Sequence, residues 1–109
     1  MKRKIVLAAA LLTFSTQAFG KATLFGKGAT SCATAMNPQT KMESRAWVLG
    51  FWSGLNSAAS MDRKNGAVGD STDALGVIGE VELECANNPS QVLAQAVFNV
   101  YARLRQMGR

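Results

Sequence analysis

Two cysteines and the absence of histidine limit the chemistry that this chain can perform. Cys32 and Cys85 are the only cysteines among 109 residues, and the chain has no His. It therefore lacks the side chain that most often acts as a general base or binds a metal near neutral pH. The two cysteines are far apart and form no CxxC motif. In an oxidising compartment they predict one structural disulfide.

The N-terminal residues predict export to such a compartment. Lys2 to Lys4 form a basic stretch, Ile5 to Phe14 are mostly apolar, and the small residues Ala18 and Gly20 follow. This order is typical of a cleaved signal peptide, which we assign to residues 1–20, with cleavage after Gly20 or after Ala22. About ten apolar residues are too few to cross a bilayer, which needs about twenty. We expect a periplasmic mature protein without a membrane span. A buried or membrane-anchoring first helix is the alternative.

The charge balance argues against a nucleic-acid partner. The chain carries a formal charge of +5, but three of its bases lie in the predicted signal peptide. The chain from Lys21 onward keeps nine bases and seven acids, a net charge of about +2. Its lysines and arginines form no tract and are not interleaved with aromatic residues that could stack on bases.

Glu80, Glu82 and Glu84 form an acidic run that could sense pH. On a helix, Glu80 and Glu84 share a face, whereas Glu82 points elsewhere. The simplest interpretation is a solvated helix surface. The alternative is acid sensing, because protonating the carboxylates of this weakly basic chain near pH 4 would favour expansion. No nucleophile or His accompanies the run, so we expect no enzyme, no metal site and no cofactor.

The stretch from Trp47 to Leu55 is the most distinctive segment. Gly50 and Gly54 are four residues apart, although glycine is unfavourable inside a helix by nearly 1 kcal/mol. Two such glycines on one face predict a close approach, either by the last helix or by a partner. The partner hypothesis makes this face a recognition groove or the seam of a homodimer. Its candidate partner-binding residues are Trp47, Gly50, Phe51, Gly54 and Leu55. We expect Trp52 inside the core and Trp47 partly exposed.

The remaining pattern predicts an all-α fold: a small bundle of three main helices plus a short N-terminal helix. After a loose leader at residues 21–30, the helical domain covers residues 31–109. Its expected helices are 32–36, about 42–60, 74–85 and 89–107, with a polar loop at 61–69. A disulfide between Cys32 and Cys85 would tie the short helix to the end of the third.

Capping residues predict where these helices begin and end. Ser31 suits the start of the short helix, and Thr40 with Glu43 forms a capping box for the long one. Asp70 or Ser71 would cap the third helix, with Asp73 assisting. Asn88, followed by Pro89 and by Gln91 in a second capping box, would start the last helix, and Gly108 would end it.

The order of these features resembles the HdeA/HdeB-type periplasmic proteins. The residues that carry the resemblance are Ser31-Cys32-Ala33, the run Glu84-Cys85-Ala86-Asn87-Asn88-Pro89, and Val92, Ala96, Val100 and Leu104 of the last helix. The resemblance implies an all-helical fold with one disulfide between Cys32 and Cys85. It also implies an acid-stress chaperone that opens at low pH and holds unfolding proteins. Apolar residues of the central helix, including Trp47, Phe51 and Leu55, would contact such clients.

The chain also resembles the small exported immunity proteins of the Tai/Rap type. This likeness rests on Gly50-Phe51 in the central helix and on Asn88-Pro89 before the last one. It implies an inhibitor that neutralises one secreted effector enzyme at neutral pH. Both resemblances predict a protein partner rather than a catalytic reaction.

Overall fold

The computed structural model describes residues 24–62 and 67–109, without the side chains of residues 60–62. The predicted signal peptide and residues 63–66 of the predicted polar loop lie outside this description. The described elements are the 3₁₀ turn η2 (Gly26–Ala29) and the helices α1 (Cys32–Ala35), α2 (Lys41–Asp62), α3 (Ala74–Asn87) and α4 (Leu93–Gln106). These residues contain no β-strand. The predicted all-α fold, with three main helices and a short first one, is confirmed.

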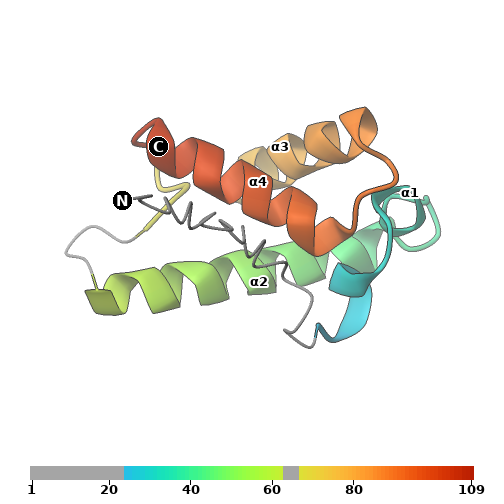
Figure 1. Ribbon diagram of the computed structural model, residues 1–109, viewed down its shortest axis with the longest axis horizontal. Helices are drawn as coiled ribbons and strands as arrows, with labels where there is room; N and C mark the ends of the chain where they lie inside the picture. The colour runs from blue at the N-terminus through green and yellow to red at the C-terminus, as the bar shows by residue number, and fades with distance from the viewer. Residues whose placement is uncertain (1–23, 63–66) are drawn as a thin grey trace, which may run out of the picture.

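The three main helices pack around one core (Figure 1). α2 and α4 run in the same direction, and α3 runs against them. Apolar side chains from all three helices meet in the centre, among them Val48, Val81 and Val97, each no more than 1% exposed. Trp52 is buried as expected: its indole N–H donates to the Val68 carbonyl at 2.8 Å. Trp47 is partly exposed, as predicted.

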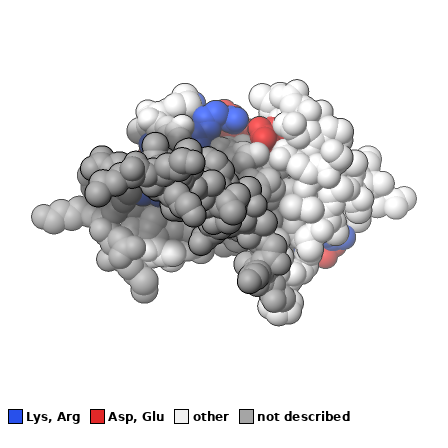
Figure 2. Space-filling model, in the orientation of Figure 1, with Lys and Arg blue, Asp and Glu red and all other residues white. Residues whose placement is uncertain are grey.

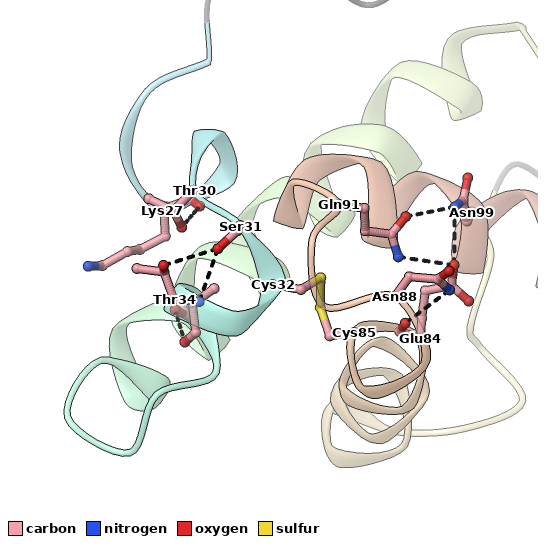
Figure 3. Close-up of a disulfide and its surroundings, with 12 residues drawn as sticks. Lys27, Thr30, Ser31, Cys32, Thr34, Glu84, Cys85, Asn88, Gln91 and Asn99 are labelled. Atoms are coloured by element: carbon pink, nitrogen blue, oxygen red, sulfur yellow. Dashed lines mark hydrogen bonds between the residues drawn. A yellow bond between two sulfur atoms is a disulfide. The ribbon is translucent and has the colours of Figure 1, made fainter.

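The disulfide fixes α1 to the last turn of α3 (Figure 3). Cys32 and Cys85 are 53 residues apart in sequence, with their Cα atoms 5.1 Å apart. Both cysteines are buried in the core. Closing a loop of this length constrains the unfolded chain and stabilises the fold by about 4 kcal/mol in the chain-entropy model.

Three of the four predicted helix starts are wrong in their caps. Ser31 accepts the Thr34 N–H and caps α1, as predicted. The Thr40–Glu43 capping box does not form, because the Thr40 N–H donates to the Asn37 carbonyl and Glu43 pairs with Lys27.

At α3 the cap is Asp73, not Asp70 or Ser71. The Asp73 carboxylate accepts the Gly76 N–H at 2.9 Å, and α3 begins at the next residue after Asp73. Asp73 is extended, as a cap residue should be, and lies nearest to the free N–H groups of the first turn.

The start of α4 differs most from the sequence prediction. α4 begins at Leu93, not after Asn88, and Val92 at its start provides no side-chain cap. Instead the Leu93 N–H donates to the Thr30 carbonyl at 2.9 Å, beside an antiparallel bridge between Ser31 and Val92. Backbone pairing with a distant segment therefore keeps residues 89–92 out of the helix. At the other end Gly108, with φ of 70°, terminates the helix as predicted.

Part of the predicted loose leader is an ordered strap, Leu24–Ser31, whose 3₁₀ turn packs on α2 and α4. The Trp47 indole N–H donates to the Phe25 carbonyl at 2.9 Å. Gly28 lies flat against the indole ring, and a Cβ atom there would overlap it. The close approach that the sequence assigned to Gly50 and Gly54 occurs at this glycine instead.

Candidate protein-binding groove

An apolar groove runs between the second half of α2 and α4. At the strap end is a pocket of about 150 Å³, and beyond it lies a more open hollow of about 840 Å³. Leu55 and Phe98 line both, so the two are continuous. We call this surface the α2–α4 groove; its residues are Leu24, Phe51, Leu55, Ala58, Ala59, Val92, Ala94, Gln95, Phe98, Tyr101, Ala102, Arg105 and Gln106.

Aromatic rings form the wall of the groove at the strap end. The rings of Trp47 and Phe51 stack with centroids 4.8 Å apart, and Phe51 meets Phe98 of α4 at 6.0 Å. Leu24 of the strap closes the pocket beside Phe51. Phe51 is therefore held between two other rings. Such a surface can bury a bulky apolar side chain of a partner without first ordering flexible groups.

Only part of the predicted binding set lies in this groove. Phe51 and Leu55 line it, whereas the strap covers Trp47. Gly50 and Gly54 are exposed, and an added Cβ atom at either would meet nothing within 4 Å. The interpretation that the last helix packs closely against these glycines is wrong, because α4 contacts α2 through larger side chains such as Phe51.

The residues that sequence reasoning missed lie on α4. Ala94, Phe98, Tyr101 and Arg105 follow a helical spacing and face the groove. They form a stripe beside the core stripe of α4, which contains Val97, Val100 and Leu104. The available signal was the spacing of these four residues at i, i+4, i+7 and i+11 along the helix.

The acidic run of α3 forms ion pairs with both helices that wall the groove. Arg103 of α4 pairs with Glu80 at 3.0 Å and with Glu84 at 3.6 Å. Glu82 points to α2, where it meets Arg45 at 2.8 Å and Lys41 at 3.5 Å. The predicted division of faces is confirmed. These side chains do more than face solvent: they join α3 to α2 and α4.

Their surroundings favour the ionised form of two carboxyls. Burial acts to raise the pKa of Glu82, but hydrogen bonds and charges from Arg45 and Lys41 outweigh it and lower the pKa. At Glu84 a hydrogen bond from Asn99 is the main cause of a lowered pKa, supported by Gln91 and Arg103 against partial burial. Figure 3 shows Glu84 with Asn99 and Gln91 near the disulfide. Both carboxylates therefore strengthen the fold at neutral pH more than in acid.

The described surface shows no large region of one charge in the view of Figure 2. Its atoms are mostly uncharged, and the acidic and basic side chains at its upper edge lie next to one another. Within residues 24–62 and 67–109 no helix is long and apolar enough to cross a membrane. The same residues contain no cluster of three or more His, Cys, Asp or Glu side chains placed to hold a metal ion.

We compared the chain with known protein families, curated proteins and solved structures. No family model, no curated protein and no solved structure matches this chain.

Proposed function

We propose that this chain is an exported, non-enzymatic protein-binding domain that works as an acid-stress chaperone of the HdeA type. In this proposal the α2–α4 groove holds apolar segments of unfolding periplasmic proteins. Acid loosens the domain and widens the groove.

One observation carries the proposal: the carboxylates of α3 pair with cations on both helices that flank the groove, α2 and α4. Glu82 pairs with Arg45 and Lys41 of α2, and Glu80 and Glu84 pair with Arg103 of α4. Protonation removes these ties together and leaves the cations unpaired. The self-repulsion of a chain with a growing positive charge then favours separation of α2 from α4.

The disulfide limits how far the domain can open in acid. Cys32 and Cys85 are covalently joined, so α1 stays attached to α3 whatever happens to the ion pairs. α2 lies within the closed loop, whereas α4 lies outside it. α4 can therefore move away in acid and return when the pH rises, since the constrained chain starts refolding from a reduced set of conformations.

The experiment follows the oxidised protein from pH 7 to pH 2 by near-UV circular dichroism and tryptophan fluorescence, with an aggregation-prone client added. We expect cooperative loss of tertiary signal below about pH 4.5, together with suppression of client aggregation. A Glu80→Gln, Glu82→Gln, Glu84→Gln triple variant should already be loosened at pH 7. An unchanged structure down to pH 2, or opening without client protection, would contradict the proposal.

A second candidate is an inhibitor or immunity protein that neutralises one effector enzyme. It is favoured by the fact that the hollow between α2 and α4 is already formed while the ion pairs of α3 are in place. It predicts tight binding of a single enzyme at neutral pH and no client protection in acid. The same titration separates the two candidates.

A further inference from the structure

The α2–α4 groove has a charge at one end that no described residue pairs with. Arg105 lines the end of the groove away from the strap. It forms no ion pair with any residue in the described ranges, although the neighbouring Arg103 binds two glutamates. The other described residues that line the groove are apolar or uncharged, and none is acidic. Among the described residues, the groove thus combines an apolar floor with one cation that forms no ion pair.

The dimensions of the groove match a short helix. Along α4 it extends from Ala94 to Arg105, which at 1.5 Å per residue is about 16 Å, or three helical turns. The enclosed pocket lies at Phe98, seven residues before Arg105, so the two are about 10 Å apart along the axis. On a partner helix lying along the groove, seven residues also separate two side chains on one face.

We propose that the groove binds an amphipathic helix of a partner protein, with an apolar anchor in the Phe51–Leu55–Phe98 pocket and a carboxylate at Arg105. The proposal rests on the groove being a protein-binding site, names the class of segment that it takes, and applies near neutral pH, where the carboxylate of the partner is ionised. The anchor supplies the affinity, because it removes apolar surface from water. The carboxylate selects between helices of similar hydrophobicity and sets their register in the groove.

Two other occupants fit the charges less well. The N-terminal residues of this chain include Lys2, Arg3 and Lys4, which carry the same sign as Arg105. A second copy could offer its α3, where Leu75 and Leu83 are exposed beside glutamates. Those glutamates already pair within their own domain. A separate acidic partner pairs Arg105 without breaking any of these contacts.

The test uses the oxidised protein in its exported form at pH 7 and two fluorescent helical peptides. Both peptides carry two leucines one turn apart. In one peptide a glutamate lies about seven residues before the leucines, and another lies about seven residues after them. The other peptide has lysines at both positions. We expect the glutamate peptide to bind about fivefold more tightly, and Arg105→Glu to reverse the preference. Leu55→Gln should weaken both peptides about tenfold, whereas its exposed control, Leu75→Gln on α3, should leave both unchanged.

The proposal is overturned if wild type and Arg105→Glu each bind the two peptides equally. It is also overturned if neither peptide binds. A dimer found by sedimentation in that case assigns the groove to a second copy. Arg105 is exposed, so the Arg105→Glu variant should fold normally. Its peptide preference therefore tests the proposal even if Leu55→Gln does not fold. Lost peptide selectivity with intact client protection in acid refutes this inference alone. Lost client protection with intact selectivity refutes the acid-chaperone function alone.

Discussion

Alanine at the glycines of α2 and of the strap should change stability in opposite directions. Gly50 and Gly54 lie inside α2 with open space around them, whereas Gly28 lies against the Trp47 ring. Alanine removes the backbone-entropy penalty of a helical glycine, which is about 0.8–1 kcal/mol per residue. The double variant Gly50→Ala, Gly54→Ala should therefore raise the free energy of unfolding by about 2 kcal/mol.

At Gly28 the new methyl group has no space. Either the Trp47 indole must move and lose its hydrogen bond to Phe25, or the strap must lift from α2. Overpacking of this kind costs about 1–3 kcal/mol. Gly28 does not have a positive φ, so the loss cannot be attributed to backbone strain.

Urea unfolding followed by far-UV circular dichroism measures these changes without relying on tryptophan fluorescence. Given a slope of about 1–3 kcal/mol per M urea, the double variant should shift the midpoint upward by about 1 M. Gly79→Ala in α3, which also meets nothing within 4 Å, is the matched control and should stabilise by a similar amount per site. Destabilisation by Gly50→Ala would show that something covers this face. A neutral Gly28→Ala would show that the strap is not docked on Trp47.

Three further changes test the other contacts that hold the fold. Glu82→Gln should lower stability at pH 7 by up to about 1 kcal/mol, since its partner Arg45 is only partly buried. Because the folded-state pKa of Glu82 lies below the ordinary value of 4.5, its contribution is present above that pH and disappears as the pH falls through it. Urea titrations of wild type and variant should therefore converge as the pH falls well below 4.5; a constant difference would contradict this account. Replacing Cys32 and Cys85 by serine should cost about 4 kcal/mol, measured the same way, and a loss under 1 kcal/mol would mean that the loop closure contributes little. Asp73→Ala should cost about 1 kcal/mol by removing the α3 cap, whereas Ser71→Ala, its control, should be close to neutral.

Local signals in the sequence predicted the features that depend on local physics. Helical periodicity located the main helices, and glycine at position 108 marked the end of α4. The two cysteines predicted the disulfide, because a chain with only two thiols has one way to pair them internally. Trp52 was correctly expected in the core.

Features that depend on distant segments could not be predicted from those signals. The start of α4 moved to Leu93 because residues 89–92 pair with the backbone near Thr30, which lies some sixty residues earlier. The expected partner of the glycines was the last helix, but the close contact is between Gly28 and Trp47. Neither pairing leaves a periodic trace in the sequence.

The candidate site was half predicted. Its α2 wall, with Phe51 and Leu55, was included in the proposed binding set, because a run of large apolar residues drew attention to that helix. Its α4 wall, with Phe98 and Arg105, was not, since a single apolar stripe was assigned to α4 and the second stripe beside it was overlooked.

The central claim is that the α2–α4 groove holds the bound protein. Hydrogen exchange of the oxidised domain, with and without a captured client at acid pH, tests it most directly. The account predicts that the client slows exchange at residues 51–59 of α2 and 94–106 of α4, and leaves the outer face of α3 around Leu75 and Leu83 unchanged. Protection confined to α3, with none on α2 or α4, would contradict it.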